Sequence, residues 1–381
     1  MLKDKGMHRL SKISIYFAVC IALFSARPWF VWDNRIIELV VIFFFIVCRL
    51  IIMRPTISKK NASPAIFALF LLGYMYVINA PDVSKAFTQT CTKVVPLVLF
   101  IQLTSSEKRL FIRSFTWIFS IILLISLLFF TLFQIGVPLP YSRISHFDAH
   151  YSEFYNYYAF IIDGHLGIFT RFRSVFTEPG HVGMFVALLM YVNNYKLLKW
   201  QRVVFLISII WSFSLAAYIL LCLGYILHLV LSRRLSKYVL FLPLGLLIAF
   251  LFVKLYYNNN KDSLISELII SRLQMTEDGN IAGNNRHTGE FTRYYENFAN
   301  SPRYITGLGC DVSQLTFLSG NASYKNFILE NGIIGIVLLI GLGLSILSSF
   351  SCPCFLCKFA CSYFFHRAHD SDINALIVFF L

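Results

Sequence analysis

The sequence predicts an all-α integral membrane protein that crosses the bilayer about ten or eleven times. Of its 381 residues, 57% are hydrophobic and only 14% are charged, and the mean hydropathy is +0.69. A soluble domain of this length needs far more polar surface to cover its core. We therefore expect a single polytopic membrane domain over 1–381. Its apolar runs lie near 13–26, 35–53, 65–79, 91–104, 114–135, 179–194, 203–231, 238–256, 326–350 and 373–381.

The length of each run decides how it is divided into helices, because one crossing needs ~20 helical residues. The run at 203–231 is too long for one crossing, so we divide it near Ser212–Ser214 into two short helices. The run at 13–26 follows a basic N-terminus and is not followed by a small-residue cleavage site. We therefore expect a retained first helix rather than a signal peptide.

The distribution of Lys and Arg predicts the orientation, because these residues favour cytoplasmic loops. With the N-terminus inside, 19 of the 33 basic residues fall in cytoplasmic segments, against only 4 acidic residues. Two long polar segments, 136–178 and 256–325, then form external loops. This asymmetry accounts for the net charge of +14, so we expect no nucleic-acid partner.

Cysteine and histidine patterns do not indicate a metal site. The four cysteines between 352 and 361 have the spacing C-x-C-x₂-C-x₃-C, which differs from the paired CxxC of zinc ribbons. His146 and His150 are four residues apart, but no Glu follows the first of them as in metalloproteases. We expect no metal, no cofactor and no structural disulfide.

The first long segment ends in a charged cluster at the mouth of the next apolar run. Glu178 and Pro179 suit the first turn of a helix. That explanation does not account for Arg171 and Arg173. They lie at the expected membrane edge, where a charged side chain is unfavourable unless it is paired with another charge or has a function. A guanidinium group offers a fixed fork of donors that suits phosphate oxygens. Five tyrosines of this segment suit either the membrane–water boundary or stacking against sugar rings: Tyr141, Tyr151, Tyr155, Tyr157 and Tyr158.

The second long segment carries a further arginine cluster, followed by Gly307-Leu308-Gly309. Nearby acidic residues roughly balance these arginines, so a solvated charged loop is one interpretation. The chain then returns to the membrane from Tyr324 through Asn331-Gly332, where small residues permit close packing. Two arginine-bearing loops on one side of a membrane indicate a site for an anionic substrate. The arginines of the second long segment are Arg272, Arg286, Arg293 and Arg303.

The stretch Arg173–Gly183, RSVFTEPGHVG, has the pattern R-x-x-F-x-E-P-x-x-x-G and resembles the element with Arg, Phe, Glu-Pro and Gly of Wzy-type O-antigen polymerases, which are relatives of the O-antigen ligases. The order of a loop arginine, a G-x-G and a Tyr-containing re-entry is also similar. The resemblance implies a GT-C-like helix bundle in a bacterial inner membrane with two long periplasmic loops. It further implies transfer of a growing glycan from undecaprenyl pyrophosphate onto a new lipid-linked repeat unit, with a chain-length regulator protein as a further partner.

This resemblance suggests roles for individual residues. Arg173 and Arg286 would contact the pyrophosphate and neutralise the negative charge that develops on it as the glycosidic bond breaks. Glu178 would be either the general base for the acceptor hydroxyl or a structural partner of Arg173, and the structural role is favoured. Four further residues are expected to bind the substrate: Arg171, Arg272, Arg293 and Tyr324.

Three other functions remain open. A ligase joining glycan to lipid A–core is one, but ligases place a His about nine residues before the acid matching Glu330. Here that region holds Asn321, Ala322 and Ser323, which favours the polymerase. A flippase is the second, although a transporter should carry polar or broken helices near mid-membrane. A purely structural subunit is the third, and it leaves the arginine loops unexplained.

Overall fold

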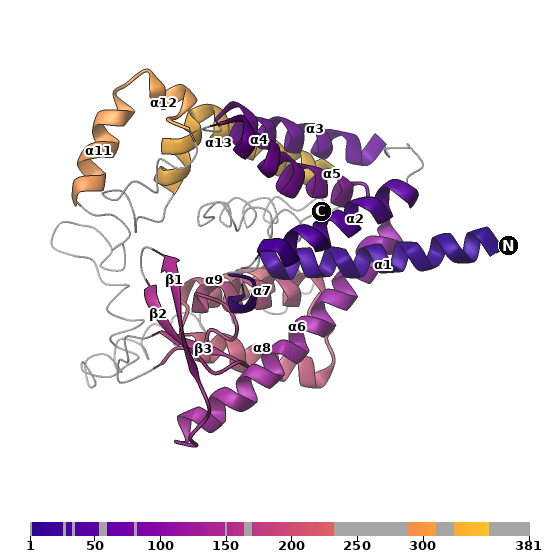
Figure 1. Ribbon diagram of the computed structural model, residues 1–381, viewed down its shortest axis with the longest axis vertical. Helices are drawn as coiled ribbons and strands as arrows, with labels where there is room; N and C mark the ends of the chain where they lie inside the picture. The colour runs from indigo at the N-terminus through magenta and orange to yellow at the C-terminus, as the bar shows by residue number, and fades with distance from the viewer. Residues whose placement is uncertain are drawn as a thin grey trace. The chain divides into compact units, whose positions relative to one another are not determined.

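The computed structural model describes residues 2–25, 28–32, 35–52, 59–79, 82–148, 151–163, 170–231, 289–309 and 324–349. This part of the chain is mostly helical (Figure 1). Its elements are α1 (Leu2–Ser25), η1 (Trp29–Val31), α2 (Arg35–Ile52), α3 (Lys59–Gly73), η2 (Tyr74–Ile78), α4 (Val83–Gln89), η3 (Thr90–Val94), α5 (Val95–Ile101), α6 (Ser105–Gln134), β1 (Ser142–Asp148), β2 (Tyr151–Asn156), β3 (Ile161–Asp163), α7 (Pro179–Val192), α8 (Lys199–Ser212), α9 (Leu215–Leu231), α11 (Gly289–Ala299), α12 (Arg303–Thr306) and α13 (Tyr324–Ser349).

Each predicted apolar run that is described coincides with one or two helices, whereas α4, α11 and α12 lie outside the predicted runs. The division of the run at 203–231 is confirmed, because α8 ends at Ser212 and Phe213 adopts a left-handed φ of 45° before α9 begins. Among the described residues, α6 and the stretch Lys325–Ser345 of α13 are long and apolar enough to cross a membrane, judged by length and composition alone. The runs at 238–256 and 373–381 lie outside the described residues.

A small sheet departs from the expected all-α fold. Three strands in the order β1-β2-β3 occupy the first long segment, and β2 pairs antiparallel with β3. Tyr, Phe and Ile favour strands, and they recur here among polar residues such as Ser142 and Glu153. The tyrosine-rich segment is therefore ordered into a sheet rather than an irregular loop.

The described residues divide into two compact units. Unit 1 contains α1 to α5, α11 to α13 and residues 105–119 of α6. Unit 2 contains residues 120–134 of α6, nearly all of the sheet, and α7 to α9. Each expected long external segment thus contributes described elements to one unit: α11 and α12 to unit 1, the sheet to unit 2.

Unit 1 has an apolar core between α3 and α13, extended by a chain of phenylalanine rings. Leu71, Met75 and Tyr76 of α3 and η2 are fully buried there, together with Leu342 of α13. The rings of Phe45, Phe100, Phe111, Phe115 and Phe119 connect α2, α5 and α6, each 5.1 to 6.0 Å from the next between centroids. Apolar contacts of this kind hold the unit together.

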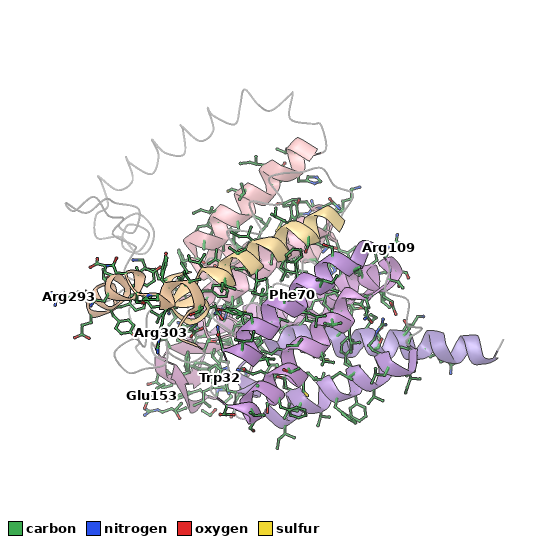
Figure 2. The ribbon with its side chains drawn as sticks, turned by 90° about the horizontal axis from the view of Figure 1, so that it is seen from above. Trp32, Phe70, Arg109, Glu153, Arg293 and Arg303 are labelled. Atoms are coloured by element: carbon green, nitrogen blue, oxygen red, sulfur yellow. The ribbon has the colours of Figure 1, made fainter. Side chains whose placement is uncertain are left out.

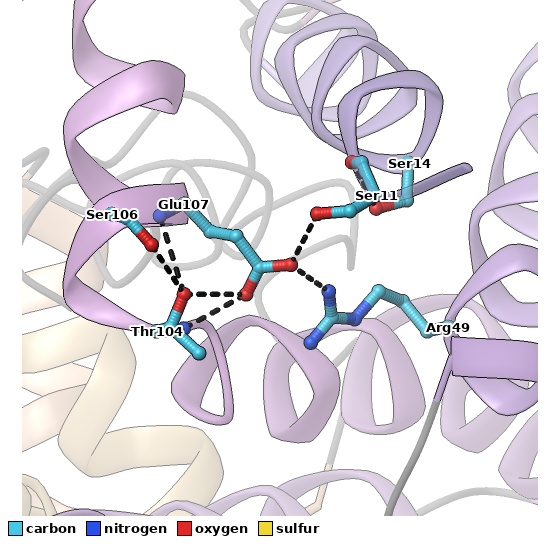
Figure 3. A network of polar contacts seen from close by, with 6 residues as sticks. All are labelled: Ser11, Ser14, Arg49, Thr104, Ser106 and Glu107. Atoms are coloured by element: carbon cyan, nitrogen blue, oxygen red, sulfur yellow. Dashed lines mark hydrogen bonds and ion pairs between the residues drawn. The ribbon is translucent and has the colours of Figure 1, made fainter. Parts of the chain in front are cut away.

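A polar network at the start of α6 connects three helices of unit 1 (Figure 3). Thr104 and Glu107 form a capping box, in which Glu107 Oε2 accepts from Thr104 N at 2.9 Å and Thr104 Oγ1 accepts from Glu107 N at 3.3 Å. Glu107 Oε1 also accepts from Ser11 Oγ of α1 and Arg49 Nη1 of α2, both at 2.7 Å. The Arg49 side chain is only 5% exposed, so its charge needs this carboxylate.

Unit 2 is built around Phe130 of α6. The ring of Phe130 lies 5.2 Å from that of Phe172, 5.5 Å from Phe160 and 5.6 Å from Trp211. Ser126, one turn earlier in α6, donates to the carbonyl of Ala159 at 2.6 Å. These contacts fasten the β2–β3 turn and the segment before α7 to α6.

Candidate functional site

The segment leading into α7 places Arg173 in the interior of unit 2. Its side chain is 6% exposed. Arg173 Nη1 donates to the carbonyl of Thr177 at 2.8 Å, and Nη2 lies 3.7 Å from Asp163 Oδ2 at the end of β3. The guanidinium carbon also lies 5.7 Å from the ring centroid of Phe154. A buried guanidinium needs such neighbours, because desolvating an uncompensated charge costs several kcal/mol.

Three other residues of the same element have packing roles. Phe176 is 1% exposed in the core. Pro179 is the first residue of α7, where its missing N–H leaves no donor unsatisfied. Gly183 faces α9 so closely that an added Cβ would lie 2.2 Å from Ala217 Cβ. The sequence pattern at these positions is thus explained by the way α7 enters and packs within unit 2.

Glu178 is the exception within this element. It occupies the N-cap position of α7 with extended backbone angles (φ −119°, ψ 140°), and its side chain makes no capping hydrogen bond. Among the described residues its carboxylate has no hydrogen-bond or ion-pair partner, and the acid beside Arg173 is Asp163. Glu178 is half-buried at the positive end of a helix, which stabilises a negative charge there. The Glu178 carboxylate therefore makes no contact that stabilises the described part of unit 2.

Arg171 fastens the preceding stretch to the end of α8. Its Nε donates to the Ser212 carbonyl at 3.0 Å and its Nη2 to the Phe213 carbonyl at 2.7 Å. The last carbonyls of a helix have no intrahelical partners, and an arginine fork satisfies two of them here. This contact gives Arg171 a task within the fold, and its role in substrate binding stays a prediction.

Replacing Arg173 with Lys tests whether its forked geometry matters. A single ammonium cannot reproduce the planar fork toward Thr177 and Asp163, and a lost charged hydrogen bond is worth about 1.5–3 kcal/mol. We expect Arg173→Lys to lower the midpoint of thermal unfolding in detergent. Arg303→Lys, the same exchange at an exposed position of α12, should leave the midpoint unchanged. An unchanged midpoint in Arg173→Lys would show that the forked contacts do not stabilise unit 2.

In unit 1 the structure brings the G-x-G motif onto the start of α13. The backbone N–H of Leu308 donates to the Leu329 carbonyl at 2.8 Å, and that of Gly309 to the Glu330 carbonyl at 3.1 Å. Gly332 interrupts α13 with φ 62° and ψ −168°, a conformation open essentially to glycine alone. The two glycine-containing motifs singled out in the sequence therefore form one tight backbone contact.

The end of η2 completes this contact. Asn79 Nδ2 donates to the Glu330 carbonyl at 3.2 Å and to Asn331 Oδ1 at 3.4 Å, and Tyr74 Oη donates to the Thr306 carbonyl. η2 is a π-helical turn, and such turns are frequent at functional sites. Glu330 is buried, at 5% exposure. The described end of the second long segment is thereby anchored to the start of α13.

The remaining predicted site residues are placed as follows. Arg293 is exposed on α11, whose opposite face packs Phe291 and Phe298 against Ile328 and Leu329 (Figure 2). Tyr324 begins α13, and its side chain lies outside the described residues, as do Arg272 and Arg286. The clustered cysteines at 352–361 also lie outside them. Within the described ranges, no group of three or more His, Cys, Asp or Glu side chains can hold a metal ion.

Two residues of these sites were not identified from the sequence. Asp163 is a lone acid in a polar segment, and only the pairing of β3 brings it to Arg173. Asn79 follows an apolar run, where a single amide suggests a helix end and nothing more. Both depend on partners far away in the chain, so no local pattern identifies them.

Comparison with known proteins gives no identification. No protein-family model, no curated protein and no solved structure matches this chain.

Proposed function

We propose that this chain is a polytopic inner-membrane glycosyltransferase that polymerises a surface polysaccharide such as O-antigen. In this proposal both long segments lie on the periplasmic side and the N-terminus lies in the cytoplasm. One observation carries the proposal. Arg173, Phe176, Pro179 and Gly183 of the Arg173–Gly183 motif each have a packing or hydrogen-bonding task, whereas the Glu178 side chain, at the N-terminus of α7, has none among the described residues. A half-buried carboxylate without such a task suits general-base catalysis.

The proposed reaction joins a sugar hydroxyl to the growing glycan. The acceptor oxygen attacks the anomeric carbon, and the bond from that carbon to the pyrophosphate oxygen breaks. The bonding electrons leave with undecaprenyl pyrophosphate, and Glu178 takes the hydroxyl proton. The negative charge that develops on the leaving group requires cationic neighbours. Arg286 is the proposed pyrophosphate contact, with Arg272, Arg293 and Tyr324 as further substrate contacts, and Arg173 positions the Glu178 segment.

Two rival functions share part of this support. A ligase would use the same lipid-linked donor but lipid A–core as acceptor, and residues 321–323 supply no His of the kind that ligases use. A flippase would carry the lipid-linked glycan without any bond being broken. A flippase does not require an unengaged carboxylate at the N-terminus of α7, and the absence of a His at 321–323 favours the polymerase over the ligase.

Deleting the gene tests the reaction directly. Without a polymerase, cells should carry lipopolysaccharide core capped by a single repeat unit, because attachment continues and elongation does not. The measurement is the lipopolysaccharide ladder on a gel, with the wild-type gene restored as control. Loss of every repeat unit would support the ligase instead.

Reporter fusions test the proposed topology. Reporters active only outside the cytoplasm should be active when fused at Asn156 and Asn284, since both long segments are proposed to be periplasmic. A fusion at Lys199, the first residue of α8, should be inactive, because the basic residues around it predict a cytoplasmic connection. Activity in the opposite pattern would place the two long segments, and the site with them, on the wrong side for this reaction.

A further inference from the structure

The outer side of the sheet in unit 2 carries a distinctive set of side chains. Side chains alternate between the two faces of a strand. Tyr141, just before β1, is 52% exposed, and Arg143 and Ser145 follow at alternate positions and are also exposed. On β2, the buried positions are Phe154 and Asn156, at 0% and 2% exposure. These two residues pack inward, so the sheet has one buried and one open side.

Ring contacts place alternate residues of β2 on that open side. The Tyr155 ring lies 5.3 Å from that of Tyr141 in an edge-on arrangement, and the Arg143 guanidinium carbon lies 5.6 Å from the Tyr155 centroid. Tyr157, two residues further on, lies 5.5 Å from Tyr141. Glu153, labelled in Figure 2, is exposed at the position two residues before Tyr155. We call this set, Tyr141, Arg143, Glu153, Tyr155 and Tyr157, the tyrosine face.

The tyrosine face is supported from below. Tyr157 stacks on Phe160 at 4.8 Å between centroids, with planes 4° apart, and Phe133 of α6 lies 5.1 Å from Tyr157. Burial and the neighbouring hydroxyls of Tyr141 and Tyr155 raise the pKa of Tyr157, so its phenol stays protonated and remains a donor. Rings held in this way lose little conformational freedom when a ligand binds.

The chemistry of this face indicates a particular ligand. The negative face of an aromatic ring attracts the weakly positive C–H groups of a sugar. A guanidinium and a carboxylate beside the rings supply a donor and an acceptor for sugar hydroxyls. Burial in lipid is unfavourable for the same two charges. Arg143 and Glu153 give the face no net charge, so it does not favour an anionic surface such as nucleic acid or an acidic headgroup.

We propose that the tyrosine face is a binding site for a saccharide segment of the substrate, separate from Arg173 and Glu178. This inference rests on the proposed polymerase function, and it names where part of the glycan is held. Such a site would hold sugars of the repeat unit while another part of the same glycan reacts. Its effect would fall on affinity and not on the bond-forming step.

Elongation kinetics test the site in the full chain. The protein would be placed in nanodiscs with lipid-linked repeat unit extracted from cells lacking the gene. Tyr141→Ala and Arg143→Gln should each raise KM about 5- to 10-fold and leave kcat unchanged, as expected from losing one aromatic or charged contact. Tyr158→Ala is the matched control, because Tyr158 is 57% exposed in the same segment without belonging to the face. An unchanged KM in both variants would overturn the site.

A binding measurement separates this inference from the reaction. The oligosaccharide released from the lipid-linked repeat unit by mild acid would be added to nanodiscs and observed by saturation-transfer NMR. Signal from wild type and Tyr158→Ala, lost in Tyr141→Ala, supports the saccharide site even if no elongation is detected. Equal signal from all three proteins, or none from wild type, overturns it. Thermal unfolding that falls in Tyr141→Ala with unchanged saccharide signal would give the tyrosine face a structural role only and would overturn the site.

Discussion

Under the proposed polymerase function, Glu178→Gln is expected to lower the rate of glycan elongation about 10²- to 10⁴-fold, the usual contribution of a general base. Gln keeps the size of the side chain and cannot take a proton. Because the Glu178 carboxylate makes no capping bond and no ion pair with the described residues, its replacement should leave the midpoint of thermal unfolding unchanged. The measurement is the initial rate of elongation in nanodiscs, with unfolding followed on the same preparation.

Glu290→Gln provides the matched control. Glu290 is exposed in the first turn of α11, so the same chemical change should leave elongation at the wild-type rate. A wild-type rate in Glu178→Gln would remove Glu178 from the reaction. A fall in both rate and unfolding midpoint would give Glu178 a structural role, as the sequence alone favoured.

Gly332→Ala is expected to prevent unit 1 from folding correctly. At φ 62° and ψ −168°, a residue with a Cβ is strained by about 1–3 kcal/mol. An added Cβ would also lie 2.3 Å from the Ile305 carbonyl oxygen and 2.5 Å from Gly307 N, and backbone atoms cannot move aside easily. The contact between the G-x-G motif and α13 would open. The measurement is the amount of folded protein recovered in detergent, with its unfolding midpoint.

Gly73→Ala serves as the comparison for this glycine. Gly73 ends α3 with helical angles (φ −61°, ψ −43°), and an added Cβ meets nothing within 4 Å. Ala there should be neutral or stabilising by about 0.5–1 kcal/mol, because alanine favours the helix. Normal recovery of Gly332→Ala would mean that the contact between the G-x-G motif and α13 tolerates rearrangement.

Local patterns were sufficient to place most of the helices. The apolar runs coincide with α1, α2, α3, α6, α7 and α13, and the break between α8 and α9 falls at the polar Ser212–Ser214 step. Helix formation depends on nearest neighbours along the chain, and long apolar segments without polar interruptions specify it strongly. The sheet was not predicted, because strand pairing joins residues that are distant in sequence and its local signal was attributed to a loop.

The sequence by itself determined that the chain is rich in apolar helices, that arginines and one glutamate gather at the start of α7, and that a G-x-G precedes the last described helix. Only the tertiary structure decided which of these side chains are engaged. Arg171 was found to satisfy carbonyls of α8–α9, Arg173 was found beside Asp163, and Glu178 was left without a partner among the described residues. Those outcomes depend on β3, α8 and α9 closing around the segment, and hydrogen bonds across such sequence distances have no local signature.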